Sequence, residues 1–261
     1  MQSPTSPEAF SRIVDTVVSC SDIMRLHWDK PRNIKRKGRI DLVTETDLAV
    51  ETALKEALSQ LYPESSFLAE ETASDAALSD MTWVIDPVDG TTNFAHGIPM
   101  CCTSVGLWNQ GELVLGVISA PMLHEVFAAA KGRGATLNGR PIAVSTTSEL
   151  EDAVVATGFP YAIRENIDPV MDNLKRTLTA AQGVRRVGSA AIDLAYTACG
   201  RFDAFYEVNL KPWDMAAGVL ILTEAGGRVS TYNPNEAHSL YSSSLLVSNG
   251  LIHDRLGALL T

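Results

Sequence analysis

The sequence predicts a layered fold of mixed helices and strands, of the α/β or α+β class. Helical periodicity opens the chain, closely spaced strands fill its middle, and helices alternate with strands in its second half. The composition agrees, because 46% of the 261 residues are hydrophobic and 20% are charged, which is enough apolar surface for a sizeable core. Since we find no low-complexity linker and no internal repeat, we expect residues 1–261 to form a single domain.

The first third of the chain is predicted to hold two helices with a basic segment between them. Apolar residues recur at helical spacing over residues 7–28, and Pro7 suits a first helical turn. Residues 33–39 (NIKRKGR) concentrate the positive charge of the sequence. A second helix is expected over residues 47–62, where Pro63 stops it.

The middle of the chain changes to strand patterns. Strands are expected at residues 66–71, 82–86, 100–108, 112–121 and 124–130. Residues 132–134 (Gly-Arg-Gly) are interpreted as a hairpin turn rather than a phosphate loop, because neither a GxGxxG pattern nor a Walker A lysine accompanies them.

The second half alternates between the two kinds of element. Strands are expected at residues 154–158, 184–188, 202–208, 228–232 and 244–249. Helices are expected at residues 166–182, 189–199, 213–225 and 251–260. Ser189 is a suitable N-cap for the second of these helices, and Gly226-Gly227 closes the third.

Charge and composition exclude several classes of function. The net charge of −10 argues against a nucleic-acid partner, which requires a basic surface. We see no apolar run of the ~20 residues that a membrane span needs, and no signal-peptide pattern at the N-terminus. The four cysteines form no CxxC motif and are interpreted as free, buried thiols in a reducing compartment, so we expect a cytoplasmic protein.

Three acidic sites lie where a strand or helix pattern begins or ends. They are the Glu70-Glu71 pair, the aspartates Asp86 and Asp89, and Asp214 inside an apolar stretch. A carboxylate in apolar surroundings must be paired or metal-bound, because burying it bare costs several kcal/mol. Since the sequence offers few nearby cations, the pattern favours a hard divalent ion such as Mg²⁺.

The turn after Asp89 adds a phosphate-binding signal. Gly90 lets the backbone approach a ligand closely, and free N–H groups at a following helix start would bind an anion. A single strand-end aspartate is usually a turn or cap residue, but no cap requires the whole block D-x-x-D-G-T-T-N. Carboxylate-bound metal beside phosphate indicates phosphoryl transfer to water.

Other catalytic patterns fit less well. The sequence has no HExxH metal motif and no GxSxG serine elbow. A phosphatase of the haloacid dehalogenase type would need D-x-D-G-T and an acidic partner in a downstream Gly-Asp pair, and this chain has neither.

Four segments together resemble the inositol monophosphatase family of Mg²⁺-dependent, Li⁺-inhibited phosphatases. They are DLVTETD (41–47), AEE (69–71), WVIDPVDGTTNF (83–94) and WDMAAGVLILTEAGG (213–227). Their order and spacing fit the family over essentially the whole chain. The resemblance implies a five-layered α-β-α-β-α sandwich, a homodimer, and a small phosphate monoester as substrate.

The resemblance also implies a metal site. Glu70, Asp86 and the carbonyl of Val88 would hold a first ion, which activates water, and Asp86, Asp89 and Asp214 would hold a second, which stabilises the leaving oxygen. A third, weaker ion would share Glu70 beneath a mobile loop at residues 35–38. We therefore expect two or three Mg²⁺ ions per site, with Li⁺ as an inhibitor.

Further residues take catalytic and substrate-binding roles by the same resemblance. Thr91, paired with Asp47, would orient the nucleophilic water. Gly90 and Thr91 would offer backbone N–H groups to phosphate, and Glu207 would bind a hydroxyl of the sugar or inositol. The predicted substrate contacts are Asp89, Gly90, Thr91, Glu207 and Asp214.

The sequence departs from the family pattern at two places, and one short segment favours a particular branch of the family. Ala69 replaces the usual glycine before the glutamate pair, and the basic residues 35–37 make the alignment of the metal loop ambiguous. Thr92-Asn93-Phe94 favours the inositol phosphatase branch over nucleotidases (DGTKEF) and fructose bisphosphatases (DGSxN).

The sequence thus predicts Mg²⁺-dependent hydrolysis of myo-inositol 1-phosphate or a close polyol phosphate. The enzymatic alternatives are fructose 1,6-bisphosphate, another sugar phosphate or a nucleotide 3′-phosphate as substrate. The non-enzymatic alternative is a metal-dependent regulatory binding protein.

Overall fold

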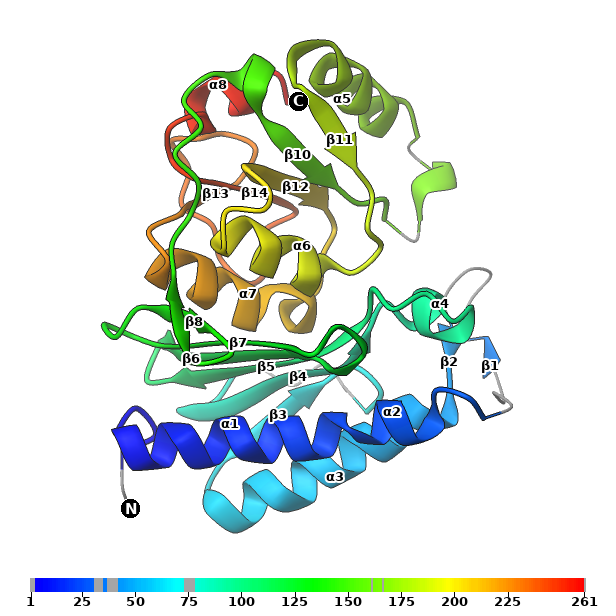
Figure 1. The fold of residues 1–261 in the computed structure, drawn as a ribbon, viewed down its shortest axis with the longest axis vertical. Helices are drawn as coiled ribbons and strands as arrows, with labels where there is room; N and C mark the ends of the chain where they lie inside the picture. The colour runs from blue at the N-terminus through cyan, green and yellow to red at the C-terminus, as the bar shows by residue number, and fades with distance from the viewer. Residues whose placement is uncertain are drawn as a thin grey trace.

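The chain folds into five alternating layers of helices and sheets, as its computed structural model shows (Figure 1). The structure describes residues 3–30, 35–36, 42–72, 78–160, 162–165 and 167–260. The helices are α1 (Pro7–Ser21), α2 (Ile23–His27), α3 (Glu45–Leu61), α4 (Thr91–Ala95), α5 (Ile167–Ala180), α6 (Ala190–Ala198), α7 (Pro212–Glu224) and α8 (His253–Gly257). Short 3-10 turns lie at Pro121–Leu123, Leu150–Asp152 and Ile163–Glu165.

The longer strands form two sheets. A seven-stranded sheet has the order β3-β4-β5-β6-β7-β8-β9 and a five-stranded sheet has the order β11-β10-β12-β14-β13. The strands of the first are β3 (Ser66–Ala69), β4 (Met81–Asp89), β5 (Cys102–Asn109), β6 (Glu112–Ala120), β7 (Glu125–Ala130), β8 (Ala135–Leu137) and β9 (Arg140–Ile142). Those of the second are β10 (Val154–Thr157), β11 (Gly183–Arg185), β12 (Ala204–Val208), β13 (Arg228–Ser230) and β14 (Ser244–Ser248). A small antiparallel pair joins β1 (Lys35–Arg36) to β2 (Leu42–Val43).

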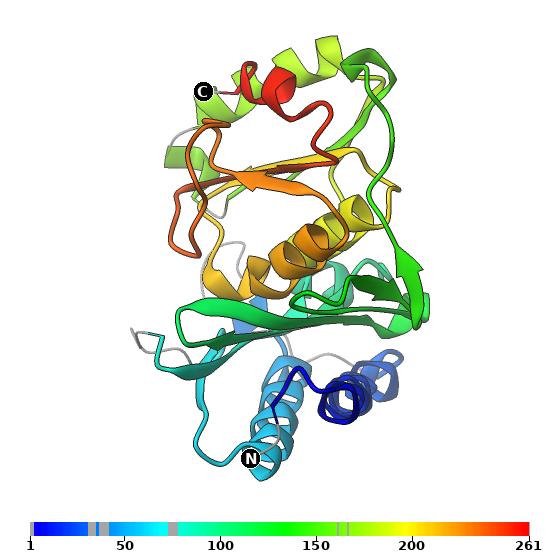
Figure 2. The same ribbon diagram turned by 90° about the vertical axis from the view of Figure 1, so that its left-hand side faces the viewer.

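The order of the layers reflects how many faces of each element are apolar, because an element with two apolar faces must be covered on both sides. Helices α1, α2 and α3 cover the outer face of the seven-stranded sheet, α6 and α7 lie between the two sheets, and α5 and α8 lie beyond the five-stranded sheet (Figures 1 and 2). The predicted α-β-α-β-α sandwich is therefore confirmed. None of the described helices combines the length and the apolar character that crossing a lipid bilayer would require.

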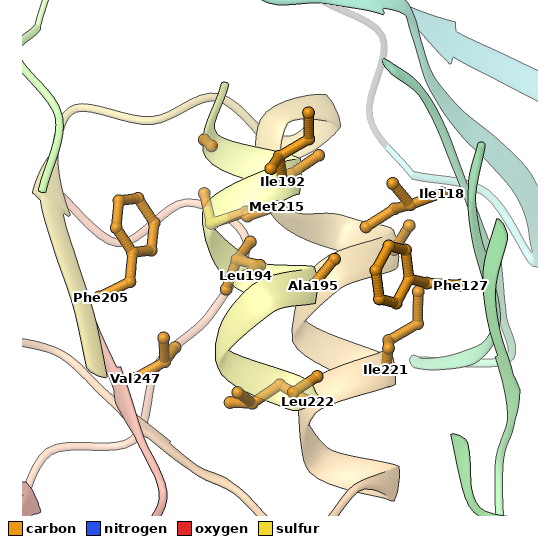
Figure 3. Close-up of a cluster of buried hydrophobic side chains, with 14 of the residues drawn as sticks. Ile118, Phe127, Ile192, Leu194, Ala195, Phe205, Met215, Ile221, Leu222 and Val247 are labelled. Atoms are coloured by element: carbon orange, nitrogen blue, oxygen red, sulfur yellow. The ribbon is translucent and has the colours of Figure 1, made fainter. Parts of the chain in front are cut away.

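The middle layer contains the largest hydrophobic cluster. In Figure 3, side chains of α6 and α7 lie between Ile118 and Phe127 of the seven-stranded sheet and Phe205 and Val247 of the five-stranded sheet. A second cluster packs α1 and α3 against the other face of the large sheet, and a third packs α8 against the small one. Burial on both faces explains why α6 and α7 are apolar almost all round.

Two sheet glycines let helix α7 approach the large sheet closely. A Cβ on Gly106 would lie 2.9 Å from Cβ of Ala216, and one on Gly116 would lie 2.6 Å from the carbonyl of Ala217. The two glycines are paired across β5 and β6, so together they form a shallow seat for the helix. This seat fixes the position of the N-terminus of α7, and hence of Asp214.

The structure refines several sequence-based element boundaries. The predicted helix over residues 7–28 is α1 followed by α2, with a one-residue break at Asp22. The predicted final helix shortens to α8, and the predicted strand over 228–232 shortens to β13. Strands β8 and β9 were not predicted, because each is only three residues long and one contains Pro141.

The Gly132–Gly134 segment is a hairpin turn between the antiparallel strands β7 and β8, as predicted. Its three consecutive N–H groups do form an anion-binding nest, but the anion is the Glu224 carboxylate at the end of α7. Gly132 N and Gly134 N each lie 2.8 Å, and Arg133 N lies 3.0 Å, from an oxygen of Glu224.

Candidate active site

An irregularity in β4 brings two aspartates of one strand together. In a regular strand, side chains three residues apart point to opposite faces of the sheet. The pairing of β4 with β5 shifts register between Asp86 and Asp89, with Pro87 between them. As a result, the two carboxyl groups act electrostatically on each other although they are an odd number of residues apart.

Asp86 is surrounded by other carboxylates. It is 2% exposed, and Val88 N donates to its Oδ1 at 3.0 Å. Burial raises the pKa of Asp86 well above its usual range, and the negative charges of Glu70, Asp89, Asp214 and Asp47 raise it further. These four charges have the same sign as Asp86, which is the arrangement that a multivalent cation stabilises.

Asp89 lies at the N-terminus of α6. Its Oδ2 accepts hydrogen bonds from Ser189 Oγ at 2.6 Å and from Ala191 N at 2.7 Å. Burial raises the pKa of Asp89 to about 6, while these donors and the N–H of Gly90 act in the opposite direction. The predicted N-cap role of Ser189 is confirmed, since its Oγ also accepts from Ile192 N at 3.3 Å.

Asp214 occupies the first turn of α7. Its Oδ2 accepts from Lys211 N at 2.7 Å, which holds the carboxylate at the start of the helix. Burial raises the pKa of Asp214 well above its usual range, and the charges of Asp89, Glu70 and Glu207 add to the effect. The first turn of α7 therefore delivers a carboxylate to the same region as the end of β4.

Glu70 follows β3, which runs parallel to β4, and its N–H donates to the carbonyl of Ile85 at 3.1 Å. A residue that the sequence did not single out supports this turn. Glu51 of α3 is 2% exposed and accepts from Glu71 N at 2.9 Å and from Thr72 Oγ1 at 2.5 Å. Lys55, one turn along α3, forms an ion pair with Glu51 at 3.0 Å.

Asp47 and Thr91 form a hydrogen-bonded pair, as the resemblance predicted. Thr91 Oγ1 lies 3.2 Å from Asp47 Oδ1 and 3.0 Å from the carbonyl of Val88. The other oxygen of Asp47 accepts from both the N–H and the hydroxyl of Thr44 in a capping box at the start of α3. The one hydroxyl proton of Thr91 is committed to these acceptors, so its oxygen is left to accept from a water molecule.

Gly90 is in the left-handed region, with φ 86°, and begins α4. A Cβ at this position would lie 2.8 Å from the carbonyl of Met100, so only glycine fits without a shift. The Gly90 N–H, which was expected to face phosphate, interacts here with the Asp89 carboxylate. An incoming phosphate would therefore compete with Asp89 for this donor.

Glu207 lies on β12, beside the end of β10. A Cβ on Gly158 would lie 2.0 Å from Glu207 Oε2, so this glycine provides the space for the carboxylate. Burial raises the pKa of Glu207 to about 8; the positive charge of Arg186 acts against this rise, and the negative charge of Asp89 adds to it. Gly158 could not be identified from the sequence, because its role depends on a neighbouring strand.

The donor set fits a hard divalent cation, because it consists of carboxylate and carbonyl oxygens with strong mutual repulsion. Within the described ranges, no group of three or more His, Cys, Asp or Glu side chains already stands ready to hold a metal ion. Of the predicted third-metal loop, the backbone of residues 35–36 is placed in β1, while residues 37–38 lie outside the described residues.

Comparison with known proteins identifies close relatives. The model of the inositol monophosphatase family matches residues 9–261. An inositol-1-monophosphatase from Synechocystis is 44% identical over 231 residues, which cover 88% of this chain and 80% of that protein. A fructose-1,6-bisphosphatase/inositol-1-monophosphatase from Thermotoga maritima is 37% identical over 90% of this chain and 88% of that protein. The solved inositol monophosphatase from Anabaena superimposes with a TM-score of 0.87 at 38% identity, covering 97% of this chain and 95% of that chain.

Proposed function

The chain belongs to the inositol monophosphatase family of phosphoric monoester hydrolases, and from this premise we propose that it hydrolyses myo-inositol 1-phosphate or a close polyol phosphate. The observation that carries the proposal is the cluster around Asp86. Four carboxylates from α3, the turn after β3, the end of β4 and the start of α7 act on this one buried carboxyl group. Such a cluster is costly unless a cation neutralises it, and phosphate hydrolysis is the chemistry in which the family uses one.

The residues proposed to hold Mg²⁺ are those expected from the sequence. Glu70, Asp86, the carbonyl of Val88, Asp89 and Asp214 would bind two ions, with a third beside Glu70. When bound, Mg²⁺ supplies positive charge that offsets the carboxylates and polarises both the phosphate and the attacking water. The family is metal-dependent; the choice of Mg²⁺, the number of ions and inhibition by Li⁺ belong to this proposal.

The protein's own groups position the water and the phosphate. Asp47 accepts the hydroxyl proton of Thr91, so Thr91 Oγ1 offers its lone pairs to a water molecule and orients it toward phosphorus. The N–H groups of Gly90 and Thr91, at the start of α4, would donate to the phosphate oxygens. Glu207 would accept a hydrogen bond from a hydroxyl of the polyol.

Two further expectations accompany the proposed activity. A homodimer is expected from the family resemblance, and a cytoplasmic location is expected from the free cysteines of the sequence. Both can be measured directly, by light scattering and by fractionation.

A direct test is release of inorganic phosphate from inositol 1-phosphate, fructose 1,6-bisphosphate and adenosine 3′,5′-bisphosphate, each with Mg²⁺ and with excess chelator. We expect Mg²⁺-dependent release led by inositol 1-phosphate, and loss of turnover by at least about 1000-fold in Asp214→Asn with the fold retained. Release led by fructose 1,6-bisphosphate would instead support the activity in the name of the Thermotoga relative. No release from any substrate, with Mg²⁺ shown to bind, would favour a metal-dependent binding protein.

A further inference from the structure

Asp193 is a buried acid that the proposed mechanism does not use. It lies in the first half of α6 and is 1% exposed. Its Oδ1 is buried and has no hydrogen-bond partner among the described residues. Asp193 is also not needed to begin the helix, because Ser189 already caps it. A buried, unpaired oxygen of this kind is rare in folded proteins and calls for an explanation.

The charges that act on Asp193 place it beside the proposed polyol site. Its pKa is raised well above its usual range, first by burial and then by the negative charges of Glu207 and Asp89, whereas Arg186 lowers it. Helix α6 also packs directly on β12, the strand that carries Glu207. Asp193 and Glu207 are therefore neighbouring buried acids on two elements in contact.

Arg186 is a cation that acts on both acids. Its guanidinium lies over the ring of Phe159, 5.5 Å from the centroid. A Cβ on Gly188 would lie 2.5 Å from Nη1 of Arg186, so the side chain passes close to the backbone just before α6. Among the described residues, Arg186 is thus the cation shared by these two carboxyl groups, and the arrangement is stable when one of them remains protonated.

The position of Glu207 is constrained on one side. Gly158 follows β10, which runs parallel to β12, and its backbone leaves no space for even a methyl group beside the Glu207 carboxylate. The carboxylate cannot withdraw in that direction. Its orientation toward a substrate hydroxyl must then be set from the remaining sides, where α6 lies.

Building on the proposed function, we infer that Asp193 is a positioning residue that acts through Glu207: in the substrate complex its neutral carboxyl group donates a hydrogen bond to the Glu207 carboxylate. This bond leaves the other lone pairs of Glu207 free to accept from a hydroxyl of the polyol. Asp193 therefore contributes to the preference for polyol phosphates over phosphate esters that lack hydroxyl groups.

The test compares the specificity constant kcat/KM for inositol 1-phosphate with that for phenyl phosphate, whose leaving group has no further hydroxyl. Asp193→Ala removes the carboxyl group without adding bulk and keeps a good helix former. We expect the ratio of the two constants to fall about 10-fold or more, mainly through a higher KM for inositol 1-phosphate. Asp193→Asn retains a hydrogen-bond donor and should restore most of the ratio.

Thr197→Val is the matched control. Thr197 is equally buried on α6, and its hydroxyl donates only to the Asp193 carbonyl, at 2.8 Å, so its loss should change the ratio less than twofold. The inference is overturned if Asp193→Ala leaves the ratio unchanged, or if kcat/KM falls by the same factor for both substrates. It is also overturned if the ratio is as low in Asp193→Asn as in Asp193→Ala. If the wild-type protein prefers another polyol phosphate, the proposed substrate is wrong, and the same ratio with that ester still decides the role of Asp193.

Discussion

Thr91 Oγ1 lies 3.2 Å from Asp47 Oδ1, joining the turn after β4 to the first turn of α3 across 44 residues of sequence. Both side chains are buried, and the Asp47 carboxylate is held from its other side by Thr44. The pair is thus held in place by burial and by hydrogen bonds on both sides of the Asp47 carboxylate. Rigid placement of a group that orients water is what a hydrolytic site requires, because misplacement reduces the rate steeply.

We expect Thr91→Val to lower kcat by about 100-fold or more, since it removes the hydroxyl but keeps the shape of the side chain. The melting temperature should fall by only a few degrees, because the buried Asp47 carboxylate loses one donor but keeps those of Thr44. Steady-state phosphate release and thermal unfolding measure the two effects. Thr92→Val is the control, because Thr92 is the exposed neighbour on the same short helix. Equal turnover by Thr91→Val and the wild-type protein would remove Thr91 from the mechanism.

Glu51→Gln should weaken Mg²⁺ binding by about 10-fold while kcat at saturating Mg²⁺ falls less. Glu51 accepts hydrogen bonds from the turn that follows Glu70, and an amide can replace only one of its two acceptor oxygens. Activity and melting temperature, each titrated with Mg²⁺, give the two apparent affinities. Glu56→Gln, an exposed change on the same helix, should have no effect. An unchanged Mg²⁺ dependence in Glu51→Gln would show that the turn is positioned by other contacts.

Glu224→Gln should reduce the free energy of unfolding by about 1–2 kcal/mol. The amide nitrogen of glutamine would face N–H groups of the turn between β7 and β8, where the carboxylate now accepts three hydrogen bonds. Denaturant unfolding measures the change. Glu149→Gln provides the comparison, because Glu149 pairs with Arg255 at 2.7 Å at an exposed position, where an ion pair contributes less than about 1 kcal/mol.

Because of His253, the free energy of unfolding should decrease as the pH falls from about 6.5 to about 4. Its ring is fully buried between Ser230 and Ser248, each 2.8 Å from a ring nitrogen. Burial lowers the pKa of His253 to about 4, and the charge of Arg228 contributes. The unfolded chain takes up a proton near pH 6.5 and the folded chain does not, so acidification favours unfolding by at most roughly 3 kcal/mol.

The measurement is the free energy of unfolding against pH for the wild-type protein and for His253→Asn. Carboxyl groups with raised pKa values, such as Asp193, act in the opposite direction, so only the difference between the two curves isolates the histidine. The curves should converge as the pH falls through this range. Parallel curves would contradict the prediction.

The layered fold could be predicted from the sequence because the patterns that indicate helices and strands lie within short, continuous segments. The apolar periods, the prolines and the capping residues act within one helix or strand, and so most elements were found with errors confined to their ends. The short strands β8 and β9, at one end of the seven-stranded sheet, were missed, because three residues carry too little pattern to distinguish a strand from a loop.

Sequence alone also selected Asp86, Asp89 and Asp214, since a carboxylate beside a buried segment requires a partner wherever the chain goes. Only the tertiary structure decided how these residues meet. The register shift in β4 brings Asp86 and Asp89 together, and the glycines beneath α7 bring Asp214 to them. Sequence analysis did not identify Glu51, Gly158 or Asp193, because each acts on a residue of another element. Their importance rests on distances between elements, which packing sets and local sequence does not encode.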